Sequence, residues 1–327
     1  MISRRRLIGL SAAAALAPAV GGRPAFAQAW PNRFVRLIAP FPAGGGTDAV
    51  GRIIAGRLSE IWGQQVVIEN RGGAGSNIGI EAAARSDPDG YTLLIASLPL
   101  AVNRFIYPPL GYDSVTDFAP VSLICTYPNV MAVPNSSPAK SVREFIDHAN
   151  ANRGRITFAS SGIGTSPHLS GELFKRMAGI EMTHVPYRGV APAMNDLIPG
   201  RVDVMFNTTG GLMPQVRGGQ VRGLAVTTAQ RFPTAPELPT VAESGVPDFD
   251  VSSWYAFLVP ARTPPDIIRK MHADTVTALS DPTVKARLQE LGVLVIGSTP
   301  AELARHLKSE MEKWEPVIKA AGITVRE

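Results

Sequence analysis

The chain has 327 residues, of which 45% are hydrophobic and 18% are charged, with a formal net charge of +5. This composition is typical of globular proteins rather than of fibres or disordered chains, and the absence of any run of five or more lysines and arginines argues against a nucleic-acid-binding surface. The single cysteine, Cys125, excludes an internal disulfide and a cysteine metal cluster.

The N-terminal residues 1–27 are predicted to be a secretory signal peptide. Residues 4–6 are arginines, residues 7–20 are apolar and rich in alanine, and Ala25-Phe26-Ala27 fits the small-x-small cleavage pattern. The apolar run is too short to span about 30 Å of hydrocarbon. We therefore expect a periplasmic protein that begins at Gln28 and is not embedded in the membrane.

Two consequences follow from this signal segment. Residues 3–8 also fit a twin-arginine signal, so the export route stays open between the general and the twin-arginine pathway. Cleavage would remove four arginines and leave 28 Lys and Arg against 27 Asp and Glu, so the mature chain is close to neutral.

The first part of the mature chain alternates strand and helix patterns. In chain order we expect a strand over residues 34–39, a helix over 50–61, a strand over 66–69, a short helix over 78–85 and a strand over 91–96. Residues 72–75 and 86–90 are a loop and a turn by composition. This order predicts parallel strands with helical crossovers.

A second alternating series begins near residue 130. Strands are expected over residues 129–133, 156–160, 182–185, 202–206 and 221–226, with helices between them. Ser141 and Glu144 form a capping-box pattern for a helix that runs through residue 149. The last helices are expected to start at residues that precede prolines, namely Thr263, Asp281 and Thr299, the last with Glu302 in a second capping box.

Two positions are predicted to divide the chain into lobes. One lies near residues 125–128, and the other is the proline-rich stretch 232–247, just before an apolar strand over 251–259. The prediction is an α/β protein of the two-lobe, Venus-flytrap type, in which each lobe is a mostly parallel sheet flanked by helices. Residues 28–127 and 249–327 form the discontinuous first lobe and residues 128–248 the second, and the two lobes close around a ligand.

Each predicted lobe carries a glycine-rich loop that leaves a strand and opens a helix. The loops are Pro40-Phe41-Pro42-Ala43-Gly44-Gly45-Gly46-Thr47-Asp48 and Ser160-Ser161-Gly162-Ile163-Gly164-Thr165-Ser166-Pro167-His168. Glycines let backbone N–H groups approach an anion, and a helix start adds its positive dipole end. Neither loop has a P-loop or dinucleotide-binding spacing, so we expect a small anion and favour a carboxylate.

The polar side chains in these loops admit more than one role. Asp48 is interpreted either as a capping residue or as a contact for a ligand hydroxyl or ammonium group. Ser166 and His168 suggest a hydrolase, but no G-x-S-x-G elbow is present and the two residues are too close in sequence for the usual geometry. Since the histidines and carboxylates are dispersed, we predict no catalytic residue, no metal site and no cofactor.

Short motifs distributed along the chain carry a resemblance to a known family. In order, the motifs are Ile38-Ala39-Pro40-Phe41-Pro42-Ala43-Gly44-Gly45 with Asp48; Val67-Ile68-Glu69-Asn70-Arg71; Pro88-Asp89-Gly90-Tyr91-Thr92-Leu93-Leu94; Ser160-Ser161-Gly162 with Gly164 and His168; Val185-Pro186-Tyr187-Arg188-Gly189 with Ala191-Pro192-Ala193; and Gly200-Arg201-Val202-Asp203. In this order the chain resembles the Bug family, the substrate-binding receptors of tripartite tricarboxylate transporters.

This resemblance implies a receptor whose loop amides, with ordered water, hold a ligand carboxylate between the lobes. Carried onto this sequence, the ligand contacts would be Phe41, Pro42, Ala43, Gly44, Gly45, Gly46, Asp48, Ser97, Ser161, Gly162, Gly164, Thr165, Ser166, His168, Tyr187 and Asn207. The expected partners are a small carboxylate and membrane transporter subunits, with the receptor itself a monomer. A receptor for a sensor kinase is the alternative, an exported hydrolase a more distant one, and the identity of the carboxylate stays open.

Overall fold

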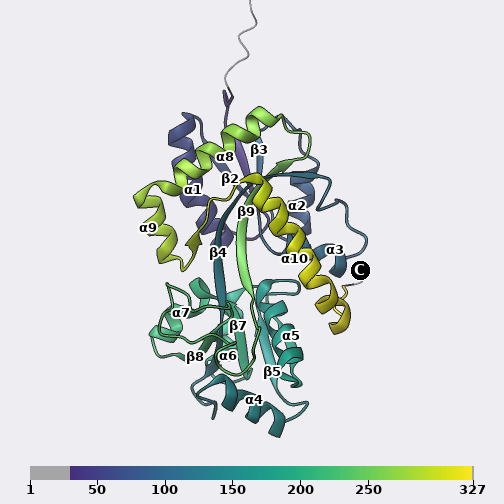
Figure 1. Ribbon diagram of the computed structural model, residues 1–327, viewed down its shortest axis with the longest axis vertical. Coiled ribbons are helices and arrows are strands. Elements are labelled where there is room, and N and C mark those ends of the chain that lie inside the picture. Colours follow the sequence, from purple (N-terminus) through teal and green to yellow (C-terminus); the bar gives the residue numbers. More distant parts are fainter. Residues whose placement is uncertain (1–29, 326–327) are drawn as a thin grey trace, which may run out of the picture.

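A computed structural model describes residues 30–325, so the predicted signal segment lies outside the described residues. Figure 1 shows two α/β halves, one above the other, connected by the long strands β4 (Phe118–Pro134) and β9 (Ser252–Pro260). The mixed α/β class matches the prediction. The exact assignment of residues to two lobes remains a prediction.

The upper half is built on a sheet of six strands. Their order is β2 (Val66–Asn70), β1 (Val35–Ala39), β3 (Thr92–Ala96), β9, β4 and β10 (Leu294–Val295). β1 pairs in parallel with β2 and β3, as the alternating pattern predicts. β9 is antiparallel to both β3 and β4, and it therefore inserts a late part of the chain into the middle of an early sheet.

Helices from both ends of the chain cover the upper sheet. They are α1 (Gly46–Trp62), α2 (Asn77–Ala84), which follows a short 3-10 turn at Ala74–Ser76, α3 (Pro99–Ile106), α8 (Pro265–Ser280), α9 (Pro282–Glu290) and α10 (Pro300–Ala321). In Figure 1, α10 runs diagonally from the upper half down toward α5. The buried Glu310 of α10 accepts hydrogen bonds from Trp254 Nε1 (3.1 Å) and Trp314 Nε1 (3.2 Å), which attaches the helix to β9.

The lower half holds a second sheet. Its strands are β6 (Thr183–Pro186), β5 (Thr157–Ser160), β7 (Val204–Thr208), the end of β4 and β8 (Val221–Val226). β5 is parallel to β6 and β7, whereas β4 is antiparallel to β7 and β8. The helices of this half are α4 (Val142–Ala151), α5 (Ser166–Ala178), α6 (Val190–Leu197) and α7 (Thr209–Arg217).

Strand β4 belongs to both sheets. Residues 118–128 pair with β9, and residues 129–134 pair with β7 and β8. The predicted boundary at residues 125–128 therefore falls inside one continuous strand of 17 residues. Motion between the halves would have to bend or twist this strand. Cys125 lies within it and is fully buried.

The predicted helix starts can be compared directly with the structure. Asp281 caps α9 through Thr283 N and Val284 N, and Thr299 with Glu302 forms the full capping box of α10, as predicted. The Thr263 prediction is wrong, because α8 follows Pro264 and the Thr263 hydroxyl donates to Pro260 O instead (2.7 Å). Within residues 30–325, every helix is too short or too polar to span a membrane.

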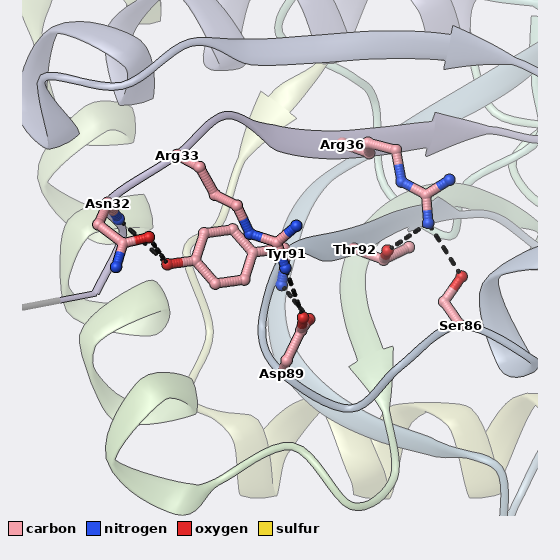
Figure 2. Close-up of polar contacts among 7 residues, drawn as sticks. All are labelled: Asn32, Arg33, Arg36, Ser86, Asp89, Tyr91 and Thr92. Atoms are coloured by element: carbon pink, nitrogen blue, oxygen red, sulfur yellow. Dashed lines mark hydrogen bonds and ion pairs between the residues drawn. The ribbon is translucent and has the colours of Figure 1, made fainter. Parts of the chain in front are cut away.

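The first described residues are tied to the turn that precedes β3. Figure 2 shows Arg33 paired with Asp89 (2.7 Å), while the Tyr91 hydroxyl donates to Asn32 Oδ1 (2.9 Å). The Arg33 guanidinium also lies 4.1 Å from the centre of the Tyr91 ring. These contacts, together with Arg36 bonded to Ser86 and Thr92 in Figure 2, fix the entry of the chain into β1.

Candidate functional site

The first glycine-rich loop leaves the carboxyl end of β1. The parallel register, which pairs Ile38 with Leu94, places Phe41 level with Ser97 just beyond the ends of β1 and β3. Asn70, at the end of β2, donates to Phe41 O (3.2 Å) and holds the loop from the other side. This edge of a parallel sheet is where α/β proteins bind ligands. Ser97 is buried, whereas Pro42, Ala43, Gly44, Gly45 and Gly46 are exposed.

Asp48 closes this loop on itself. Gly44 has a φ of +83° and donates its N–H to Asp48 Oδ2 (2.9 Å), and Arg52 Nε donates to the same oxygen (3.0 Å). Burial works to raise the pKa of the Asp48 carboxyl, but the hydrogen bonds from Arg52 and Gly44 outweigh it and hold that pKa below its ordinary value. Asp48 is therefore an ionised carboxylate whose charge is already paired.

The second loop contains the same arrangement with a different side chain. Gly164 has a φ of +76° and donates its N–H to His168 Nδ1 (3.2 Å). Because Nδ1 accepts, a neutral His168 carries its proton on Nε2, which lies 4.0 Å from Glu172. Burial, with contributions from His184 and Lys175, lowers the pKa of His168 to about 2. His168 is thus a neutral acceptor inside the loop.

A second histidine, which sequence reasoning treated as one of several scattered histidines, supports this loop from below. His184 stacks on His168 with ring centroids 3.9 Å apart, and its Nε2 lies 2.7 Å from Ser160 Oγ. Ser160 in turn accepts the N–H of Gly162 (3.2 Å). His184 on β6 and His168 on α5 therefore both contact the loop, through Ser160 and Gly164. The contact of His184 with the loop depends on the pairing of β5 with β6, which the sequence alone does not show.

The Ser166 hydroxyl is directed away from His168. It lies 2.5 Å from Ser253 Oγ on β9 and donates to Asn129 Oδ1 on β4 (3.2 Å). Asn129 Nδ2 donates to Ser170 (2.9 Å). Ser166 and His168 thus have separate partners and do not form a nucleophile and base pair.

A buried chain of hydroxyls links the start of α1 to the start of α5. The Tyr255 hydroxyl interacts with Thr47 in the first turn of α1 and with Tyr127 on β4, and Tyr127 interacts with Ser253. The two tyrosine rings lie 4.9 Å apart. Since Ser253 contacts Ser166, both loops meet at the crossing of β4 and β9. Sequence reasoning missed these residues, although polar positions inside the apolar strand 251–259 were the available signal.

Three predicted site residues lie beside one another on the lower sheet. The parallel register pairs Ser160 with Pro186 and Ala159 with Met205, so Ser161, Tyr187 and Asn207 lie at the carboxyl ends of β5, β6 and β7. The Tyr187 hydroxyl donates to Asp196 (2.7 Å), and burial together with this carboxylate raises the pKa of Tyr187 to about 12. Asn207 Oδ1 accepts from Thr208 N (2.8 Å).

Asn207 retains an unused donor. Its side chain is 1% exposed, and its Nδ2 has no hydrogen-bond partner among the described residues. A buried amide without a partner is costly. A ligand acceptor or an ordered water at the end of β7 would satisfy it. The end of β7 therefore offers a side-chain donor beside the second loop.

The site offers backbone donors and few charges. Neither α1 nor α5 has a side-chain cap, so the first-turn N–H groups of both helices are available to an anion. Within the described residues, no three His, Cys, Asp or Glu side chains are grouped to hold a metal ion. A cavity of about 660 Å³ lies elsewhere, between α7 and α9, and contains neither loop.

The chain matches a known protein family and is similar to known members of it. Residues 50–323 match the model described as the tripartite tricarboxylate transporter family receptor. The protein BugT of Bordetella pertussis is 33% identical over 305 residues, which cover 93% of this chain and 94% of BugT.

Solved structures agree with this match. An R. palustris protein solved with adipate is 40% identical, with a TM-score of 0.85 over 90% of this chain and all of the other. MatC from Rhodopseudomonas palustris, solved with bound malate, is 32% identical, with a TM-score of 0.79 over 88% of this chain and 99% of the other.

Proposed function

This chain belongs to the tripartite tricarboxylate transporter receptor family, and we propose that it binds a small carboxylate between its two halves and delivers it to the membrane subunits of such a transporter. Membership of this periplasmic receptor family makes the chain a solute receptor and not an enzyme. The separate hydrogen-bond partners of Ser166 and His168 fit the same conclusion.

The observation that carries the proposal is the meeting of two uncapped helix starts. The first turns of α1 and α5 are connected by the hydroxyls of Tyr255, Tyr127 and Ser253, which are neutral and buried. Two positive helix ends favour an anion, and the carboxylate of Asp48 in the first turn of α1 is paired with Arg52. The exposed glycines of the first loop leave the backbone accessible to it.

The ligand class is drawn from the chemistry of the site and from the relatives. A carboxylate accepts backbone N–H donors at both loops, and Asn207 Nδ2 supplies a side-chain donor nearby. Relatives at 40% and 32% identity were solved with adipate and malate. We therefore expect a carboxylic acid of that size. Hydrogen bonds to a charged group contribute roughly 1.5–3 kcal/mol each, enough for micromolar affinity, about −8 kcal/mol.

A thermal-shift and calorimetry screen with adipate, malate and aromatic acids tests the ligand class. A ligand at 100 times its Kd should add about 2.7 kcal/mol to the free energy of unfolding. Gly162→Val, at a φ of +139°, should weaken binding about tenfold or more, because a valine strains the loop backbone. Arg188→Ala removes an exposed side chain and should change the Kd little.

Two results would contradict the proposal. The carboxylate class is wrong if no carboxylate stabilises the protein. If Arg188→Ala abolishes binding while Gly162→Val binds normally, a side-chain salt bridge rather than the loop backbone anchors the ligand.

Delivery to a transporter has a separate test. Uptake of the identified carboxylate by cells or proteoliposomes that contain the membrane subunits should require this receptor. Normal uptake without the receptor would favour a sensing role.

A further inference from the structure

The two loops contain the same type of hydrogen bond, from a glycine N–H to a side chain, made by different residues. In each, a glycine with positive φ donates its N–H to the side chain four positions later: Gly44 to Asp48 Oδ2 at 2.9 Å, and Gly164 to His168 Nδ1 at 3.2 Å. Both acceptors lie in the first turn of the following helix, and both are buried, at 5% and 3% exposure. The spacing is the same in the two halves of the molecule.

We propose that the side chains of Asp48 and His168 are positioning groups that preset the two loops and do not touch the ligand, an assignment that rests on the proposed carboxylate-binding function. The sequence had placed both among the ligand contacts. Their acceptor atoms instead face their own loops. Each of these two hydrogen bonds, Gly44 N–H to Asp48 and Gly164 N–H to His168, fixes the backbone conformation of its loop, and we call each of them a lock.

The chemistry of Asp48 favours this role in particular. An ionised carboxylate beside the ligand would repel a second carboxylate. Asp48 avoids this because Gly44 N–H and the Arg52 guanidinium already bind its oxygens, at 2.9 Å and 2.9–3.0 Å. The negative charge is directed to the loop, and the first turn of α1 keeps its positive character.

The lock also determines which donors remain for the ligand. Helix hydrogen bonding begins with Ala49 N to Gly45 O in α1 and with Leu169 N to Thr165 O in α5. The N–H groups of Gly44 and Gly164 are used in the locks, so the donors left to a carboxylate are the first-turn N–H groups that follow. In α5 these belong to Ser166 and His168, because Pro167 has none.

A matched pair of substitutions tests the lock at His168. His168→Asn places an amide oxygen where the imidazole Nδ1 lies, so the acceptor for Gly164 N–H is kept, whereas His168→Gln places its polar atoms near Nε2. Both variants lose the same ring stacking on His184. By calorimetry, the Kd for adipate should rise about tenfold or more in His168→Gln and change little in His168→Asn.

A corresponding pair tests Asp48. Asp48→Leu keeps the branching at Cγ but has no acceptor, and should weaken adipate binding about tenfold. Arg52→Gln removes the ion pair but leaves the oxygen that Gly44 N–H binds, and should bind adipate nearly as the wild type does.

Amide hydrogen exchange in the unliganded protein tests the locks without a ligand, and so independently of the proposed carboxylate binding. The Gly164 amide should be protected in the wild type and in His168→Asn, and should exchange about tenfold faster in His168→Gln. Equal exchange rates and equal affinities in the Asn and Gln variants would overturn the lock. A wild type that binds no carboxylate of the screen would contradict the proposed function alone, since the exchange comparison needs no ligand.

Discussion

Single residues at this site act mainly on the backbone of their own loops. Ser160, Asp48 and His168 accept N–H groups from glycines within four residues, and Tyr187 and Ser166 donate to other protein groups. Under the proposed function, the donors that remain for a ligand are mainly peptide N–H groups and the Asn207 amide. Peptide donors have fixed directions and no charge to titrate. Such a site recognises the carboxylate group more than the rest of the molecule.

The stacked histidines predict an acid-sensitive stability. Burial, as the largest cause, lowers the pKa of His184 to about 4 and that of His168 to about 2. Unfolded histidine titrates near 6.5, so the unfolded chain binds more protons below that pH. The free energy of unfolding should fall as pH drops from about 6.5 toward 4 for His184, and on toward 2 for His168, by up to about 1.4 kcal/mol per pH unit for each.

Urea unfolding between pH 7 and 4 measures this slope. His184→Gln should flatten it, even though the loss of the bond to Ser160 lowers stability overall. His148→Gln, on α4 and away from both loops, is the matched control for removal of a histidine. An unchanged slope in His184→Gln would contradict the assignment.

Sequence reasoning located the loops but not the roles of their side chains. The pattern of glycines followed by a helix start identified both segments, because turn chemistry is local. It left Asp48 between capping and ligand contact, since that choice depends on where Gly44 N–H points. The roles of Tyr255, Tyr127 and Ser253 depend on strands far apart in the chain, which local patterns do not record.

Among the secondary-structure elements, β4 and α3 are the ones that hydrophobic periodicity did not predict correctly. The sequence predicted a strand only from residue 129, yet Pro128 pairs with Ser252 in the β9 ladder and belongs to the same continuous strand. Helix α3 was not predicted. Leu100, Ala101 and Val102 are buried and Arg104 is exposed, but the helix has only eight residues, which is too short for a clear helical period.

Helix α10 should depend strongly on its buried carboxylate. Glu310→Leu removes the acceptor of both Trp254 Nε1 and Trp314 Nε1. Two buried indole N–H groups would lose their partner, at roughly 1–3 kcal/mol each. We expect the unfolding midpoint in urea to fall accordingly, and much less in Glu310→Gln, which keeps an oxygen acceptor. Equal stability of the two variants would show that packing alone holds α10 on β9.

At the scale of the whole molecule, ligand should favour a closed arrangement. Each half offers one helix start, so both can contact the same carboxylate only when the halves approach. Solution scattering should show a smaller radius of gyration with saturating adipate than without it. Gly162→Val, measured at the same adipate concentration, is the control and should close less. Identical profiles with and without ligand would contradict closure.

The place of β9 in the upper sheet has a consequence for how the protein is made. β9 lies between β3 and β4, yet it begins at residue 252 of 327. Ribosomes synthesise roughly 5–20 residues per second, so the nascent chain lacks the central strand of its first sheet for many seconds, until β9 at Ser252–Pro260 has been added. During that time β3 and β4 present open edges, which other chains can pair with. Both edges are covered only when β9 pairs with β3 and β4.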